Sequence, residues 1–159
     1  MTSPPNSADA RSVNSLHSMS VRPVSDPNGL EITAWLEAFA AAVRSADYDA
    51  GRQLFADDVV AFGTVGVMLS GLDTLVAQQW KHIWETTRGF HFHLNKLTCN
   101  VAGDVAWAVV PWTSFGIGSD GAEFDRHGRG TYILERRDGR WLAVHTHHSL
   151  DPVATPVSH

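Results

Sequence analysis

The sequence predicts an α+β fold in which three N-terminal helical segments pack on one face of a curved antiparallel sheet. Two observations lead to this prediction. Apolar residues between Leu30 and Thr87 recur mostly at helical spacing, whereas from Phe90 onward the spacing changes to two. Short Gly and Asp turns also divide the second half, which is the pattern of consecutive hairpins.

The helical segments come first along the chain. LEITAWLEAFAAAVRSADYD, residues 30–49, forms one apolar stripe at i, i+3 and i+4 steps and predicts a long helix. A short helix is expected from about Tyr48 to Phe55, ending at Asp57-Asp58. VVAFGTVGVMLSG then predicts two short strands joined at a glycine bend. Residues 71–87 are helical again in their spacing.

Four strands are predicted after the third helix: FHFHLNKLTCNV, VAWAVVPWTSFGI, EFDRHGRGTYILERR and RWLAVHTHHSL. The turns between them are Gly103-Asp104, residues 118–121 and Asp138-Gly139. The order of helices followed by strands places the helices together on one face of the sheet.

The ends of the chain differ from this core. Residues 1–27 are rich in Ser, Pro and Asn without an apolar period, so a disordered arm is expected, closed by the turn cluster at 26–29. The folded domain is expected over 28–152 and a flexible tail over 153–159. The N-terminus has no apolar signal-peptide core, and no stretch is long and apolar enough to span a membrane.

The composition indicates the cellular compartment and the classes of partner to expect. The net charge of −5 with neutral His disfavours nucleic acid and anionic membranes as partners. One cysteine allows no internal disulfide, and a cytoplasmic location is the expectation. Six tryptophans in 159 residues indicate a deep core, a ligand cavity or an interface.

Two segments link the chain to a known family: AFAAAVRSADYDAGRQLFADDVV near the start and GRGTYILERRDGRWLAVHTHHSLDP at the end. Over residues 30–152 the chain resembles the nuclear transport factor 2-like superfamily, and SnoaL-like proteins are the closest in it. The second segment is also similar to the association domain of calcium/calmodulin-dependent protein kinase. The resemblance implies a cone-shaped sheet with a helix-lined pocket, and a homodimer or higher homo-oligomer made through the sheet. The aromatic residues predict a small hydrophobic ligand of aromatic or polycyclic type, and no cofactor is expected.

The resemblance does not extend to the family's catalytic carboxylates. Ketosteroid isomerase has its base on the strand after the helices, where VVAFGTVG holds neither Asp nor Glu. Its Tyr and protonated Asp pair also has no match. At the position of the Asp used by scytalone dehydratase stands Arg44 or Ser45, while Asp47 and Asp49 fit the cap of the second helix. An enzyme of this sequence is therefore expected to be a cofactor-free isomerase, cyclase or dehydratase with a His base.

His145 or His147 is predicted to be that base. Residues two apart on a strand face the same side, so both share a face with Trp141, and His148 faces the other side, unless a bulge intervenes. Neutral imidazole accepts a proton near pH 7. The alternative is that the pair lies in a subunit interface or at a strand end.

A metal site is not predicted. His91 and His93 form a second pair with ligand spacing, but the family's strand order places their strand at the far edge from His145 and His147. Cys99 is alone.

Arg129 is the predicted group that steadies an oxyanion, because it stands mid-strand between Gly128 and Gly130, which leave room for a ligand. The alternative is an ion pair with Glu123 or Asp125. The residues predicted to contact the ligand are Phe62, Trp80, Trp84, Trp107, Trp112 and Tyr132. Two functions stay open: a small-molecule binding protein, with or without catalysis, and a non-catalytic association module.

Overall fold

The computed structural model describes residues 26–153; residues 1–25 of the predicted arm and 154–159 of the predicted tail lie outside the described residues. Helix α1 (Pro27–Ser45) begins at Asp26, whose Oδ1 accepts a hydrogen bond from Asn28 N at 3.0 Å. Pro27 stands in the first turn, where its missing N–H costs no helical hydrogen bond. The predicted turn cluster is therefore the N-terminal cap of α1.

The second helix is shorter than predicted. Helix α2 (Tyr48–Arg52) ends before β1 (Phe55–Phe62), which runs through Asp57-Asp58. Both carboxylates are exposed while Val59 and Ala61 are buried, and the pairing of β1 with the last strand shifts register there. An irregular strand can turn two consecutive polar residues to solvent. The Asp pair therefore lies within β1 and does not mark the end of a helix.

The third predicted helix is one helical segment with a π-helical middle. It consists of α3 (Leu72–Leu75), η1 (Val76–Trp80) and α4 (Lys81–Ile83), and it follows the two-residue strand β2 (Leu69–Ser70). Over residues 26–153, no helix has both the length and the apolar character needed to cross a membrane.

The remaining strands are β3 (Thr87–Phe92), β4 (Thr98–Ala102), β5 (Val105–Ile117), β6 (Glu123–Arg137) and β7 (Arg140–Leu150). The predicted strand FHFHLNKLTCNV is interrupted by the 3₁₀ turn η2 (Leu94–Lys96). Sheet order is β2-β1-β7-β6-β5-β3, with β4 also paired to β5. All pairs are antiparallel except β1 with β7.

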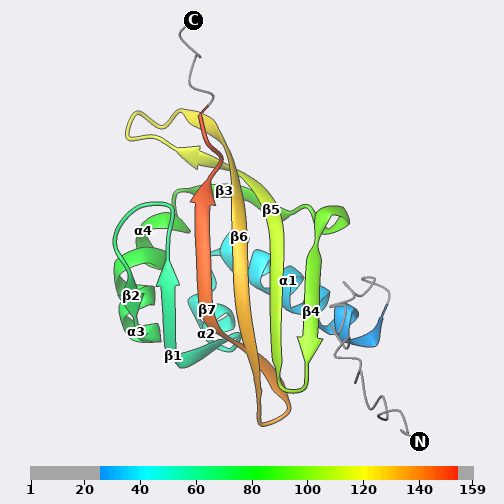
Figure 1. Cartoon of the computed structure of the whole chain (residues 1–159). Helices are drawn as coiled ribbons and strands as arrows, with labels where there is room; N and C mark the ends of the chain where they lie inside the picture. Colours follow the sequence, from blue (N-terminus) through cyan, green and yellow to red (C-terminus); the bar gives the residue numbers. More distant parts are fainter. Residues whose placement is uncertain (1–25, 154–159) are drawn as a thin grey trace, which may run out of the picture.

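Helix α1 lies across one face of this curved sheet, and the segment α3–α4 lies beside β1 (Figure 1). The predicted α+β architecture is confirmed. We call the sheet face toward α1 the inner face and the opposite face the outer face. The buried core lies between α1 and the inner face, and includes Ile32, Leu36, Phe39, Val59, Ala108, Val110, Tyr132 and Leu134.

Two glycines on β6 make room for aromatic rings on the inner face. A Cβ on Gly128 would overlap the indole of Trp112, its partner across the β5–β6 ladder. A Cβ on Gly130 would lie 2.8 Å from the Tyr132 hydroxyl oxygen. These glycines therefore accommodate two rings of the protein itself.

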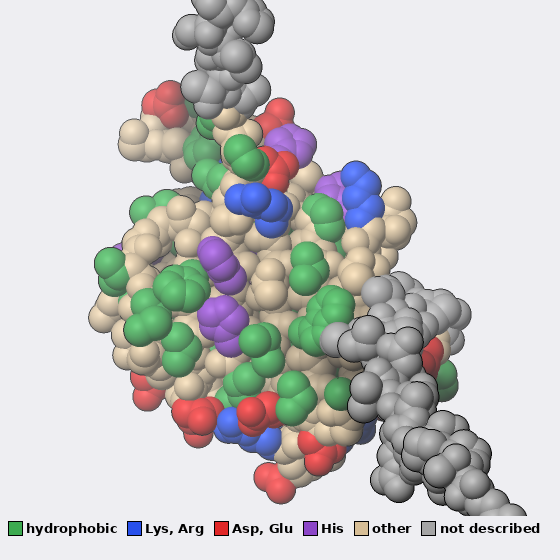
Figure 2. Space-filling view, in the orientation of Figure 1, with side chains coloured by type: hydrophobic (Ala, Val, Ile, Leu, Met, Phe, Trp, Pro, Cys, Tyr) green, Lys and Arg blue, Asp and Glu red, His purple; other side chains and the backbone are tan. Residues whose placement is uncertain are grey.

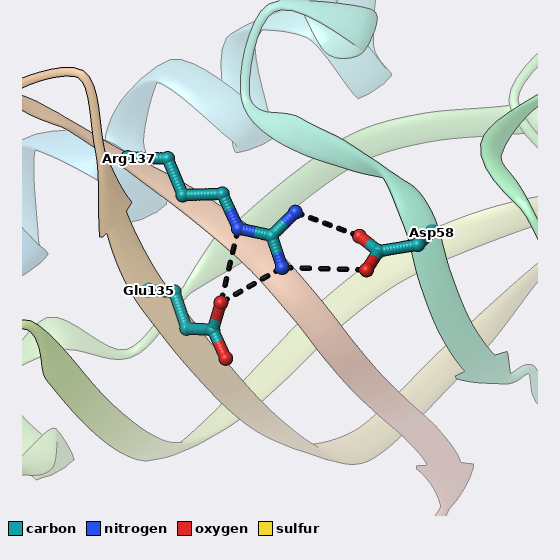
Figure 3. Close-up of polar contacts among 3 residues, drawn as sticks. All are labelled: Asp58, Glu135 and Arg137. Carbon is teal, nitrogen blue, oxygen red and sulfur yellow. Dashed lines mark hydrogen bonds and ion pairs between the residues drawn. The ribbon is translucent and has the colours of Figure 1, made fainter.

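At the tip of the β6–β7 hairpin, Arg137 joins two strands. Its guanidinium donates to Asp58 of β1 at 2.8 and 3.4 Å and to Glu135 of β6 at 2.8 and 3.0 Å (Figure 3). The hydrogen bond from Arg137 is the main reason that the pKa of Asp58 is lowered, and the same bonds raise the pKa of Arg137.

Candidate functional site

A cavity lies between α1, the segment η1–α4 and the inner face of the sheet. Its volume is about 50 Å³, and roughly 10–15 Å³ on this scale suffices for one water molecule. The apolar walls are Phe39, Val43, Phe55, Trp80, Ile83, Trp84, Phe90 and Trp112. The polar lining residues are Thr64, Gln79, Thr87, Ser114, Arg126, Thr146 and His148. None of these residues is an Asp or Glu.

Trp80 and Trp84 form one wall as a stacked pair. Their ring centroids are 4.3 Å apart at 18°, and the ring of Tyr48 on α2 stacks on Trp84 with centroids 5.6 Å apart. A Cβ on Gly51 would lie 2.6 Å from Trp84, so α2 can approach the stack only through a glycine. The π-helical segment that presents Trp80 also presents Gln79, and such segments recur at functional sites.

A bulge in β7 decides which histidine faces the cavity. Ile133 pairs with His145 and Leu134 pairs with Ala143, so Val144 is an extra residue in β7. Trp141 and Ala143 are inward before the bulge, and Thr146 and His148 line the cavity after it. Without the bulge, the alternation would have turned His145 and His147 inward.

His148 is paired with Tyr132 of β6. The Tyr132 Oη and His148 Nε2 atoms share a hydrogen bond of 2.6 Å, and the Tyr132 side chain is completely buried. Burial lowers the pKa of His148 from its ordinary 6.5 to about 4, with a smaller contribution from His147, and it raises the pKa of Tyr132 well above 10. Both groups are therefore neutral at pH 7, and the surface that His148 retains faces the cavity.

Three buried side-chain atoms have no hydrogen-bond partner within residues 26–153, and all three belong to cavity residues. They are Trp112 Nε1, Ser114 Oγ and Arg126 Nε, which we call the donor cluster. Ser114 and Arg126 are direct partners across the β5–β6 ladder, and Trp112 is two residues from Ser114. Arg126 Nη2 donates to Thr87 Oγ1 at 2.6 Å. Burial lowers the pKa of Arg126, but an arginine keeps its charge.

The predicted catalytic residues lie on the outer face. His145 Nδ1 is 2.9 Å from the Val60 carbonyl oxygen, and the Phe62 ring contacts both His145 and His147, with centroids 5.7 and 5.2 Å apart. Arg129 donates to Ser149 Oγ at 3.2 Å and to the Leu150 carbonyl at 3.3 Å.

Neither predicted ion pair of Arg129, with Glu123 or Asp125, occurs among the described residues. The structure thus separates His145, His147 and Arg129 from the cavity, because the bulge and the strand parity turn them outward.

The predicted ligand contacts divide between the two faces. Trp80, Trp84 and Trp112 line the cavity. Tyr132 lies behind His148, while Phe62 and Trp107 do not line it; Trp107 alternates outward between the buried residues of β5.

The second histidine pair is at the opposite edge of the sheet, as the strand order predicted. His91 and His93 Nε2 lie 3.0 and 3.3 Å from Thr113 Oγ1 on β5. Burial lowers the pKa of His93. Within residues 26–153 no group of three or more His, Cys, Asp or Glu side chains is arranged to hold a metal ion.

Sequence reasoning did not predict that His148 and Arg126 line the cavity. For Arg126 a signal was present, since Gly128 and Gly130 share its strand parity and glycine opposite an aromatic marks the crowded inner face. For His148 no comparable signal exists, because one extra residue in a strand leaves no compositional mark.

Comparison with known proteins agrees with this architecture. Among functionally curated proteins no relative is found. A Xanthomonas campestris structure identified provisionally as a calcium/calmodulin-dependent protein kinase II association domain is 21% identical, with a TM-score of 0.70 over 86% of this chain and 98% of that one. A nuclear transport factor 2-like protein from Salmonella enterica is 20% identical, with a TM-score of 0.70 over 82% and 95%.

A third structure, from Streptomyces avermitilis, is identified provisionally as a dehydratase of the nuclear transport factor 2-like family; it is 18% identical, with a TM-score of 0.68 over 78% of this chain and 97% of that one. At these identities the structures establish the shared fold. The model of the SnoaL-like domain matches residues 32–154. The chain therefore belongs to the SnoaL-like domain family, within the nuclear transport factor 2-like superfamily.

Proposed function

We propose that this protein binds a small, largely apolar molecule in the cavity beneath α1 and moves a proton within that molecule without a cofactor. The observation that carries the proposal is the neutral imidazole of His148, held by Tyr132 among aromatic walls. Buried polar groups in an apolar cavity are typical of ligand sites. The Streptomyces neighbour's provisional identification as a dehydratase supports this class of reaction.

In the proposed reaction His148 takes the place that the sequence predicted for His145 and His147. The imidazole accepts a proton from a C–H bond of the ligand, and the electron pair of that bond forms a new double bond while a neighbouring double bond shifts or a neighbouring C–O bond breaks. The proton then goes to the atom at the far end of the shifted double bond, or to the departing hydroxyl, which leaves as water. With its pKa at about 4, His148 is available as an acceptor at pH 7 but is a weak base.

Nuclear magnetic resonance can test the binding step through the indole N–H signals. A neutral aromatic probe, benzyl alcohol, is expected to shift the signals of Trp80, Trp84 and Trp112, which line the cavity. Trp107 and Trp141 lie outside it and serve as internal controls. Shifts confined to these two controls, or no shift at millimolar probe, would reject the cavity as a binding site.

The proton-transfer step can be tested with 5-nitrobenzisoxazole, whose isoxazole ring opens by cleavage of its N–O bond when a base removes the proton on the isoxazole carbon. We expect acceleration over buffer, lost in His148→Gln and retained in His145→Gln, a matched change on the opposite face of the same strand. The catalysed rate should rise through about pH 4 and then level off, since only neutral His148 accepts a proton. No acceleration by the wild-type chain would reject this step and leave the binding result to stand alone.

A second function is supported by the outer face. Apolar side chains that are 37–47% exposed lie on β1, β5 and β6 there: Phe62, Val105, Val109, Phe115 and Ile133. Figure 2 shows hydrophobic and histidine side chains gathered on this face with the charged ones toward its margins. The occupant that we propose is a second copy of the chain, because the same apolar patch on both copies can close a two-fold interface. The Xanthomonas neighbour identified as an association domain favours assembly.

Sedimentation velocity tests the assembly. Val109→Glu on the outer face should turn a dimer into a monomer. Leu30→Glu should not, because Leu30 is an exposed apolar residue of α1, away from the outer face. A wild-type chain that is monomeric at tens of micromolar would reject the interface.

A further inference from the structure

The donor cluster has an electrostatic character that the apolar walls do not explain. Arg126 is the one charged residue among those that line the cavity, and no lining carboxylate balances it. Within residues 26–153 its guanidinium makes no ion pair and donates hydrogen bonds to the Thr87 hydroxyl and the Phe115 carbonyl. A half-buried cation that faces a cavity without a counter-charge is an anion-binding group.

The two neutral members of the cluster point to the same chemistry. Trp112 and Ser114 are more than nine-tenths buried, at 3% and 4% exposure, yet Trp112 Nε1 and Ser114 Oγ have no partner within the described residues. Buried polar atoms are nearly always hydrogen-bonded in native proteins. Three exceptions on adjacent ladder positions of β5 and β6, and no others among residues 26–153, indicate a place where a ligand supplies the acceptor.

The position of the donor cluster within the cavity is also informative. It lies on the sheet side, on β5 and β6, while the stacked Trp80 and Trp84 lie on the helical side. His148 of β7 is also on the sheet side, with its ring centroid 6.0 Å from that of Trp112. A molecule that spans the cavity therefore has one polar end and one apolar, flat end.

We infer that the ligand is a small monocarboxylate with an aromatic or other planar apolar body, its carboxylate held by Arg126, Trp112 and Ser114. This inference rests on the binding function proposed above and specifies its ligand class. One guanidinium with two neutral donors matches the single charge and the two oxygens of a carboxylate. A phosphate group, with about two charges, would leave one uncompensated in this cavity.

A matched pair of probes tests the charge requirement. Benzoate and benzamide have the same shape and differ in charge, and their binding is measured by calorimetry with the wild-type chain at pH 7. Benzoate is expected to bind at least 10-fold more tightly, because hydrogen bonds to a charged group are worth roughly twice neutral ones. Equal affinity of the two probes would overturn the inference while leaving the cavity function intact.

Two arginine variants test which residue binds the carboxylate of benzoate. Arg126→Met should weaken benzoate binding roughly 10- to 100-fold, the value of a charged hydrogen bond, and change benzamide binding little. Arg129→Met is the matched control, since Arg129 lies on the outer face and should affect neither probe. Unchanged benzoate affinity in Arg126→Met would overturn the inference.

Ser114→Ala provides a second variant that does not remove a bond seen in the folded chain, so it remains informative if Arg126→Met fails to fold. It should weaken benzoate several-fold more than benzamide. If neither probe binds the wild-type chain while benzyl alcohol does, only the carboxylate inference fails. If none of the three binds, the proposed cavity function fails with it.

Discussion

Tyr132 Oη and His148 Nε2 lie 2.6 Å apart, on neighbouring strands and beneath the cavity. Tyr132 has no exposed surface, and Trp35, Phe39 and Phe92 surround its ring. The hydrogen bond therefore fixes the imidazole on a rigid support, as a site residue requires. It also gives each of two buried polar groups a partner in a region where an unpaired one is costly.

The half-buried imidazole of His148, which is desolvated in the folded chain, predicts a pH dependence of folding. The pKa of His148 is about 4 in the folded chain and near 6.5 when unfolded. Between these values the unfolded chain binds the extra proton, so stability is complete above about pH 6.5 and falls as the pH drops toward 4. The slope in that window is at most about 1.4 kcal/mol per pH unit.

Urea unfolding at pH 7 and pH 5 measures this dependence. The free energy of unfolding is expected to be lower at pH 5 by about 2 kcal/mol from this group alone. His148→Gln removes the titrating group and should remove that part of the difference, whereas His145→Gln should keep it. An equal pH dependence in wild type and His148→Gln would contradict the assignment.

Tyr132→Phe tests the hydrogen bond itself. The substitution keeps the ring and removes the hydroxyl, so His148 Nε2 loses its partner. The expected loss of stability is about 1–3 kcal/mol, the cost of an unpaired buried group. Tyr48→Phe is the control, because the Tyr48 hydroxyl bonds to Glu85 at an exposed position. Similar midpoints in urea for both variants would show that the Tyr132 bond adds little.

The sequence allowed much of the sheet to be predicted. The strands 105–117, 123–137 and 140–150 match β5, β6 and β7 to the residue, because their alternation is regular and Gly or Asp turns bound them. The strand order also separated the two histidine pairs as expected. These features depend on local chemistry that repeats along the chain.

What could not be predicted depends on single residues. The bulge at Val144 reverses the facing of everything after it in β7, so His145 and His147, the predicted catalytic residues, lie outward and His148 lies inward. Local composition is the same with or without it, since Val144 suits either arrangement. The inward position of Arg126 and the outward position of Arg129 have a different cause: both faces of β6 carry an arginine, and only the packing of Trp112 over Gly128 identifies the inner one.

The hydrogen bonds between Arg137 and Asp58 predict how the Asp58 carboxylate titrates (Figure 3). Because the guanidinium lowers the pKa of Asp58, the carboxylate adds stability above its ordinary pKa of 3.8 and loses it as the pH falls through the lower folded value. Arg137→Met should raise the pKa of Asp58 toward 3.8 in carboxyl nuclear magnetic resonance. Arg52→Met breaks a different ion pair, with Asp73, and should leave Asp58 unchanged. An Asp58 pKa that stays low in Arg137→Met would assign the shift to the backbone instead.

Ser114→Ala is expected to leave the free energy of unfolding unchanged or raise it, and to weaken benzoate binding. In the free protein the hydroxyl is buried and unpaired among the described residues, so its removal should leave stability unchanged or raise it by up to about 1 kcal/mol. Ser45→Ala, where the hydroxyl donates to the Ala41 carbonyl at 2.9 Å on the surface, should change stability by a few tenths at most. Thermal unfolding without ligand compares the two. A marked loss of stability in Ser114→Ala would mean that the hydroxyl serves the fold, whereas a gain together with weaker benzoate binding is expected of a group retained for its ligand.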